Sequence, residues 1–272
     1  MRPICPGCAR PVSVCLCDVI PSPRWNLQTR LLVLQHPHEL KHKLATVPVL
    51  SRCIQPCHVV VGRRLHSSNW PFAASDDAGH TLLLFPGPDA TELKLWYEEV
   101  TDRERVGAVE RAEDALPRSM QALKVVRNDS DQNEDNGGGG VIKPKDIQIT
   151  LVVVDGTWEH AQEMVKASLP FLSKFVTQVC LPFDVRSEGF GVGESDLIIR
   201  KEPYGGCVST MEAVARSLAI LEPDGHMVES NLMDVLRKMV SLQALHFSSP
   251  KIRPKLKKRS KEGLDMQVDK NG

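Results

Sequence analysis

The sequence predicts an α/β protein that is built on a mainly parallel β-sheet with helices on both faces. Residues 149–154 form an unbroken apolar run, which is typical of a central strand that helices cover on both sides. Short β-branched and Leu-rich runs alternate along the chain with segments of helical periodicity, a pattern typical of parallel sheets. With 272 residues, 42% of them hydrophobic, the chain can form one large core or two small ones.

Four further strands are expected, and turn-forming residues end two of them. Pro37 prevents the first strand from continuing, and Pro86 with Gly87 ends the third. The four segments are residues 29–35, 57–63, 81–87 and 175–181.

Helical patterns lie between these strands, in residues 38–53, 159–169, 208–221 and 227–246. Ser209 and Thr210 precede Glu212 at the start of the third helix, which is a helix-start signature. The last segment places its apolar residues on one face: Leu232, Val235, Leu236, Met239 and Val240.

Three parts are expected along the chain. Residues 1–25 form a cysteine-containing ribbon, residues 26–248 form the main α/β domain, and residues 249–272 form a basic, flexible tail. An acidic and Gly-rich insertion interrupts the domain at about residues 101–145. Residues 104–123 within it are compatible with an amphipathic helix, whereas residues 128–140 are too polar to order a backbone.

The zero net charge hides an uneven distribution of charge. Residues 250–261 carry seven Lys or Arg and no acid, which suits phosphate contacts, a nuclear address or a solvated tail. No stretch approaches the ~20 apolar residues of a membrane helix, and the N-terminus lacks an apolar signal block. We therefore expect an intracellular protein of the cytoplasm, the nucleus or both, without a membrane partner.

Four of the eight cysteines cluster as C-x2-C-x6-C-x-C. Disulfides are rare in a reducing compartment, so clustered thiols are first considered as metal ligands. The alternative is a set of free thiols in a flexible N-terminus. A closed site of four sulfurs is structural, because it leaves no position for water or substrate. The expected ligands of one Zn²⁺ are Cys5, Cys8, Cys15 and Cys17.

Asp155 follows the most apolar strand, at the edge where open α/β sheets place their ligand crevices. Gly156 beside it allows a close backbone approach. Asp155 either belongs to such a crevice or caps the following helix, and Trp158 is either a ligand platform or a core aromatic residue.

Two loops and one His-rich segment also follow strand ends or precede a helix. Residues 85–90 and 200–213 combine turn residues with strand or helix ends, and the second could bring backbone N–H groups to an anion. In residues 36–46, the histidines lack a partner set with zinc-site spacing, so the sequence alone does not favour a metal there. The phosphate-binding and nucleophile signatures G-x-G-x-x-G after a strand, G-x-x-x-x-G-K-[ST] and G-x-S-x-G are absent.

Read in order, these motifs resemble the DTW-domain family over about residues 3–221. They are the two cysteine pairs, HPHE at 36–39, LLLFPGPDA at 82–90, VVVDGTW at 152–158 and the end P-x5-STMEA at 203–213. The resemblance implies a fold related to the knotted SPOUT methyltransferases, S-adenosylmethionine as cofactor and tRNA as partner. It also implies transfer of a 3-amino-3-carboxypropyl group to N3 of uridine, with methylthioadenosine released.

Site residues follow from these motifs. Asp155 is the candidate general base, because N3 of uridine must lose a proton before it attacks. The expected cofactor-binding residues are Phe85, Pro86, Gly87, Asp155, Gly156, Thr157, Trp158, Arg200, Pro203, Ser209, Thr210 and Glu212. The expected tRNA-binding residues are His36, Glu39, Lys41, Lys251, Arg253, Lys255, Lys257, Lys258 and Arg259.

Two other functions remain open. The first is methyl transfer to RNA by a SPOUT-like enzyme, since the pocket geometry decides which carbon of the sulfonium faces the base. The second is a zinc-stabilised RNA-binding adaptor without catalysis. The sequence leaves the oligomeric state open.

Overall fold

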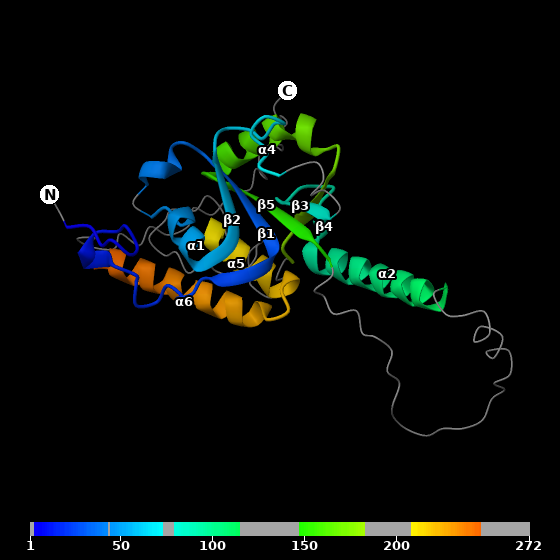
Figure 1. Ribbon diagram of the computed structural model, residues 1–272. Coiled ribbons are helices and arrows are strands. Elements are labelled where there is room, and N and C mark those ends of the chain that lie inside the picture. Colours follow the sequence, from blue (N-terminus) through cyan, green and yellow to red (C-terminus); the bar gives the residue numbers. More distant parts are fainter. Residues whose placement is uncertain (1–2, 43, 73–78, 115–146, 183–207, 246–272) are drawn as a thin grey trace, which may run out of the picture.

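The computed structural model describes residues 3–42, 44–72, 79–114, 147–182 and 208–245 (Figure 1). Most of the expected insertion, the expected contacts Arg200 and Pro203, and the basic tail lie outside the described residues.

Six parallel strands form one sheet in the order β2-β1-β5-β3-β6-β4. The apolar run predicted as a central strand is β5, and it lies between β1 and β3. The five strands predicted from the sequence are all present, whereas the two-residue β4 is too short to give a periodic signal. The bounds are β1 Trp25–Gln35, β2 Ile54–Val61, β3 His80–Leu84, β4 Thr91–Glu92, β5 Ile149–Asp155 and β6 Val176–Cys180.

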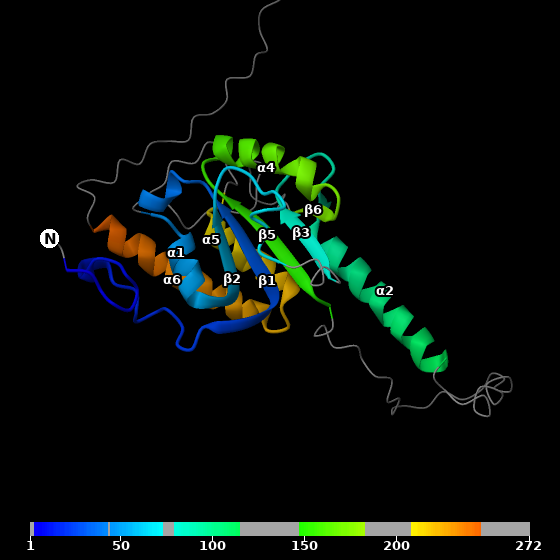
Figure 2. The same cartoon turned by 45° about the horizontal axis from the view of Figure 1, so that its top comes forward.

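Helices cover both faces of this sheet, as predicted. In Figure 1 and Figure 2, α4 crosses one face, while α5 and α6 lie against the opposite face. The helix bounds are α1 Val47–Cys53, α2 Leu93–Asp114, α4 Trp158–Leu172, α5 Thr210–Leu221 and α6 Gly225–Ala244.

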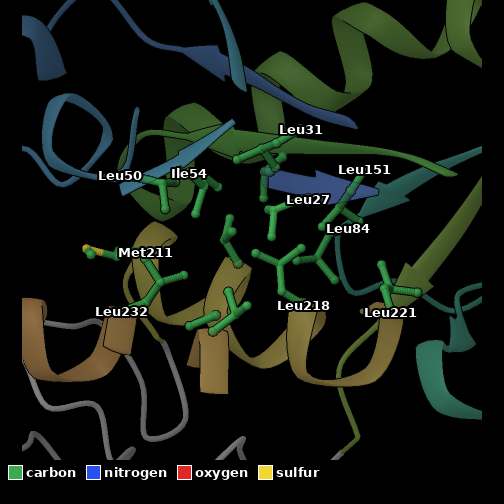
Figure 3. Close-up of a cluster of buried hydrophobic side chains, with 14 of the residues drawn as sticks. Leu27, Leu31, Leu50, Ile54, Leu84, Leu151, Met211, Leu218, Leu221 and Leu232 are labelled. Carbon is green, nitrogen blue, oxygen red and sulfur yellow. The ribbon is translucent and has the colours of Figure 1, made fainter. Parts of the chain in front are cut away.

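Alternate residues of β5 enter two separate cores, because successive side chains of a strand point to opposite faces. Leu151 and Val153 join the larger core with residues of α5 and α6, and Figure 3 shows Leu151 among these side chains. Val152 joins the smaller core with Met164 and Val165 of α4. An apolar run without polar alternation is therefore what a strand buried on both faces requires.

Two helical segments differ from the prediction. Residues 38–53 form a short 3-10 turn at Glu39–Lys41 and then α1, which has a proline in its first turn, at Pro48. The helix α2 begins at Leu93, before the expected start of the insertion at residue 101. Buried Leu93, Trp96 and Val100 explain the earlier start, because these side chains anchor the first turns of α2 in the core.

The cysteine-containing segment packs onto the domain. Leu16 is fully buried in the larger core, and Lys238 of α6 forms an ion pair with Asp18 at 3.2 Å. Arg52 of α1 donates to the carbonyl of Gly7 at 3.3 Å. Within the part of the chain that the structure describes, no helix has the length and apolar character of a membrane span.

Candidate functional site

The C-terminal ends of β1, β5 and β3 lie side by side in the centre of the sheet. Gln35 at the end of β1 is paired with Asp155 at the end of β5. The segments that follow these strands carry the HPHE, DGTW and FPG motifs, so the sheet order brings three distant motifs together. Open parallel sheets bind their ligands at this edge.

Asp155 is only 2% exposed and joins three elements. Its Oδ1 accepts a hydrogen bond from Thr210 Oγ1 at 2.6 Å, and its Oδ2 accepts one from Gln35 Nε2 at 3.0 Å. The backbone N–H of His36 donates to the Asp155 carbonyl at 2.8 Å. Both side-chain bonds are charge-assisted, so this carboxylate connects β1, β5 and the start of α5.

Thr157, rather than Asp155, caps α4. Its extended backbone and its side-chain oxygen, which accepts from the N–H of His160 at 3.3 Å, are those of an N-cap residue. This resolves the alternative that the sequence left open, because Asp155 does not cap that helix.

Phe85 and Trp158 form a stacked pair beside Asp155. Their ring centroids are 5.4 Å apart and their planes differ by 17°. Both side chains are half-buried. Trp158 is therefore not a fully buried core residue, and the pair offers a flat apolar surface at the edge of the sheet.

Gln178 of β6 holds the loop that carries Phe85. Its Nε2 donates to the Phe85 carbonyl at 2.8 Å, and the Phe85 N–H donates to the Val179 carbonyl at 2.9 Å. A Cβ at Gly87 would lie 2.6 Å from Gln178 Nε2, so glycine permits this contact. Pro86, between the two, is exposed. The sequence motif did not identify Gln178, which lies on another strand.

Ser209 caps α5, and its hydroxyl accepts from the N–H of Glu212 at 3.2 Å. Glu212 itself is fully buried, and its carboxylate pairs with Arg216 at 2.7 Å. The expected helix start is confirmed. Within this helix start, Thr210 points its hydroxyl at Asp155, whereas the Glu212 side chain lies in the interior.

His36, His38 and His160 come together at the same edge. The rings of His36 and His160 are stacked with centroids 3.9 Å apart, and His38 meets both edge-on at 4.7 and 5.4 Å. The sequence analysis missed His160, because the contact depends on β1 and β5 being neighbours. The signal available in the sequence was the H-x-H pair after one strand and a histidine soon after another.

The charged form of His36 is disfavoured in this cluster. Burial, and then the positive charges of His160, His38 and Arg63, lower the pKa of His36 below its ordinary value, and Glu39 opposes this. The neutral imidazole form of His36 is therefore favoured more strongly than in an ordinary histidine. Of the other two residues expected to bind tRNA here, Glu39 is buried and Lys41 is exposed.

The four clustered cysteines lie at a distance from one another that suits a metal ion. The Sγ separations are 3.5 Å for Cys5 and Cys17, 3.7 Å for Cys8 and Cys15, and 3.4 Å for Cys15 and Cys5. A tetrahedral Zn²⁺ with bonds of about 2.3 Å separates its sulfurs by roughly 3.8 Å. The four thiols could therefore hold a metal ion, as expected.

The four thiols interact with one another, and these contacts shift the pKa values of Cys5 and Cys17 in opposite directions. Backbone hydrogen bonding from Cys8, then contacts with the thiols of Cys15 and Cys17, lower the pKa of Cys5 to about 6. Hydrogen bonding with Cys5 and then Cys15 raises the pKa of Cys17 to about 12. Gly7 is required here, because a Cβ at that position would lie 2.7 Å from Cys17 Sγ.

These features define an α/β protein with a candidate ligand site at the C-terminal edge of its sheet and a tetracysteine ribbon packed on the domain. The DTW domain family matches residues 2–244, and the chain belongs to that family.

Three curated relatives are similar to the chain over most of its length. The chain is 34% identical to tRNA-uridine aminocarboxypropyltransferase A of Arabidopsis thaliana, over 95% of this chain and 87% of that protein. It is 30% identical to tRNA-uridine aminocarboxypropyltransferase 2 of Mus musculus, over 90% of this chain and 65% of that protein. Identity to the protein of the same name in Drosophila melanogaster is 32%, over 80% of this chain and 66% of that protein. No solved structure matches the chain.

Proposed function

We propose that this protein is a transferase that modifies uridine in tRNA, and that it moves a 3-amino-3-carboxypropyl group from S-adenosylmethionine to N3 of the base. The observation that carries the proposal is the convergence of the DGTW, FPG and STMEA segments around Asp155 at one edge of the sheet. The names of the curated relatives support the substrate and the transferred group.

The residues at this edge fit S-adenosylmethionine. The half-buried faces of Phe85 and Trp158 suit an adenine ring, since stacking needs a flat apolar surface. The N-terminus of α5, which begins after Ser209, suits the methionyl carboxylate, because its N–H groups and helix dipole favour an anion. When bound, S-adenosylmethionine would supply the electrophilic aminocarboxypropyl carbon, and methylthioadenosine would leave as the bond between that carbon and the sulfonium sulfur breaks. Arg200 and Pro203 remain proposed contacts.

Two roles for Asp155 are open within this proposal. As a general base, its carboxylate takes the proton of uridine N3, so that the N3 electron pair can attack carbon. As a positioning residue, it holds Thr210 and therefore the start of α5 against β5. A carboxylate has about four acceptor sites, so two hydrogen bonds do not by themselves prevent proton transfer.

A pair of variants separates these roles. Asp155→Asn removes both the base and the charged acceptor, whereas Thr210→Val leaves the carboxylate and breaks only its bond to α5. If Asp155 is the base, turnover falls far more in Asp155→Asn than in Thr210→Val at saturating cofactor. If it positions α5, both variants weaken cofactor binding to a similar extent.

One incubation tests the function itself. Purified protein is mixed with tRNA and S-adenosylmethionine, and the digested nucleosides are analysed by mass spectrometry together with the cofactor product. The proposal predicts aminocarboxypropyl-uridine and an equal amount of methylthioadenosine. A methylated nucleoside with S-adenosylhomocysteine would instead identify a SPOUT-like methyltransferase. Binding of tRNA without cofactor consumption would identify a zinc-stabilised RNA-binding adaptor.

We further propose that the tetracysteine ribbon holds one structural Zn²⁺, since four sulfur ligands leave no open position. The exposed Lys41 and the basic residues Lys251, Arg253, Lys255, Lys257, Lys258 and Arg259 are proposed to contact tRNA phosphates through their charge. His36 and Glu39 are proposed to contribute to tRNA binding from the edge of the sheet. We also propose that the protein acts inside the cell, in the cytoplasm, the nucleus or both.

A further inference from the structure

Three histidines from two separate strand ends meet at the edge of the sheet. His36 and His38 follow β1, and His160 lies in the first turn of α4, after β5. One ring nitrogen from each lies within 4.8 Å of the others. The neighbouring positions of β1 and β5 in the sheet produce this arrangement, which spacing along the chain does not reveal.

From this geometry we propose that His36, His38 and His160 form a second metal site, for one divalent ion of the zinc type. Three imidazoles are a ligand set that Zn²⁺ and related ions accept. Such a set leaves at least one coordination position for water or an oxygen of a substrate, unlike the closed tetracysteine site. The proposal does not rest on the transferase chemistry, although His36 is also a proposed tRNA-binding residue.

The backbone allows the close approach that a shared ion needs. A Cβ at Gly156 would lie 3.2 Å from Cβ of His160 and 3.5 Å from Cβ of His36. Glycine at this position therefore permits the close approach of His160, while His36 lies at ordinary contact distance from the same position. In addition, His160 Nδ1 is buried and has no hydrogen-bond partner within the described part of the chain. An ion would give a ring nitrogen of this side chain a partner.

Binding requires a change of ring orientation. Ligand nitrogens on one tetrahedral Zn²⁺ with bonds of about 2.0 Å are roughly 3.3 Å apart, so the nitrogens must move closer than 4.8 Å. The stacked rings of His36 and His160 differ by 11° in plane, and parallel rings cannot both direct in-plane lone pairs at one ion. Rotation of the His160 side chain would remove this parallel arrangement. The exposed His38 side chain is not packed in the core, so it can reorient as well.

Hydrogen bonding of His36 also changes on binding. Its Nδ1 accepts a 3.3 Å bond from the backbone N–H of His38, which places the proton of the neutral ring on Nε2. An ion bound at Nδ1 replaces this long bond and leaves Nε2–H as a donor. The site is therefore assembled by the ion rather than preformed, in contrast to the tetracysteine cluster.

Cobalt titration of the full chain tests the proposal, because Co²⁺ reports the type of its ligands. Protein with its tetracysteine site filled by zinc, as verified by metal analysis, is titrated with Co²⁺. Binding to the histidines gives weak visible d–d absorption without the sulfur-to-cobalt charge-transfer band that thiolate ligands produce. Competition with Zn²⁺ then gives the zinc affinity.

His160→Gln is the diagnostic variant, and His226→Gln is the matched control, since His226 is an exposed histidine outside the cluster. We expect one additional ion per chain in the wild type and in His226→Gln. In His160→Gln we expect the affinity to fall by at least the roughly 10- to 100-fold that loss of an outer contact to a metal ligand costs. His38→Gln should behave in the same way, and it covers the case in which His160→Gln does not fold.

Absence of a second ion in the wild type would overturn the proposal, as would equal Co²⁺ binding by His160→Gln, His38→Gln and His226→Gln. A spectrum with the charge-transfer band would assign the cobalt to cysteine and also count against it. Histidine ring ¹⁵N shifts provide a readout that does not depend on enzyme activity, because only coordinated rings should move on addition of Zn²⁺.

Discussion

Thr210 donates a 2.6 Å hydrogen bond to Oδ1 of Asp155, so the first residue of α5 is held against the last residue of β5. Gln35 donates to the other oxygen at 3.0 Å from the neighbouring strand. Because the acceptor is a buried carboxylate, these donors also replace water that it loses on folding. The geometry of the proposed cofactor site therefore depends on this one side chain.

Removal of the Thr210 hydroxyl should destabilise the fold. Thr210→Val keeps the shape of the side chain but leaves a buried carboxylate with one donor fewer, which costs about 1–3 kcal/mol. Urea unfolding at neutral pH measures the free energy of unfolding. Thr210→Ser is the control, because it keeps the donor, and it should lose much less. A loss in Thr210→Ser as large as or larger than that in Thr210→Val would contradict the prediction, because the methyl group would then matter at least as much as the hydrogen bond.

The sequence predicted the central features of the fold because hydrophobic patterns are local. The unbroken run in β5 indicated burial on both faces, and that is what alternate packing of Val152 and Val153 into two cores requires. The start of α5 was predicted because Ser209 caps it through a contact three residues away. The start of α2 was misjudged, because the charged residues after Val100 gave no apolar periodicity from which the buried first turns of α2 could be recognised.

The candidate site was predicted only in part, because side-chain contacts across the sheet depend on strand order. Asp155 was identified from its place at a strand end, but its partners Gln35 and Thr210 lie 120 and 55 residues away. His160 could not be linked to His36 before β1 and β5 were known to be neighbours. Strand order follows from long-range packing, which no local pattern encodes.

Loss of zinc from the ribbon should lower the stability of the whole domain. The buried side chain of Leu16 and the ion pair of Asp18 with Lys238 connect the ribbon to the core and to α6. Cys8→Ser removes one ligand, so we expect loss of the bound zinc and a lower Tm. Cys180→Ser, at a cysteine outside the cluster, should keep the zinc.

Metal analysis and thermal unfolding at several pH values test this prediction. Thiols must lose their protons to bind zinc, so protons compete with the ion and the affinity falls as pH falls. The difference in Tm between wild type and Cys8→Ser should therefore be larger at neutral pH than in mild acid. Zinc-free wild-type protein with an unchanged Tm would contradict a structural role.

The stacked pair of Phe85 and Trp158 should contribute to cofactor affinity. Stacking of a base on an aromatic side chain is worth about 1–3 kcal/mol, so Trp158→Ala should weaken S-adenosylmethionine binding by roughly 5- to 150-fold. Trp158→Phe keeps a flat ring and should lose less. Isothermal titration calorimetry measures both affinities.

Trp70→Phe is the control for this pair. Trp70 packs against Phe72, Phe171 and Phe175 in a separate aromatic cluster. Its substitution should leave cofactor affinity unchanged, even if it alters stability. Unchanged binding in Trp158→Ala would exclude the pair as the adenine platform.

Glycine at position 156 should be required for packing at the sheet edge. In Gly156→Ala the new Cβ lies 3.2 Å from Cβ of His160, which is closer than an ordinary carbon contact, whereas Cβ of His36 at 3.5 Å is in ordinary contact. Cβ of His160 cannot rotate away from this contact, so His160 must move by a few tenths of an ångström. Overpacking of this kind costs typically about 1–3 kcal/mol.

Gly62→Ala is the matched control for this prediction, because the nearest atoms to its new Cβ lie at 3.8 and 3.9 Å. The alanine there reduces the freedom of the unfolded chain without a clash, so its stability should be unchanged or raised by up to roughly 1 kcal/mol. Urea unfolding of both variants gives the two free energies. Since His160 must move in Gly156→Ala, its ring signals in NMR should shift, whereas those in Gly62→Ala should stay. If both alanines were tolerated equally, the close packing of these histidines on residue 156 would not limit stability.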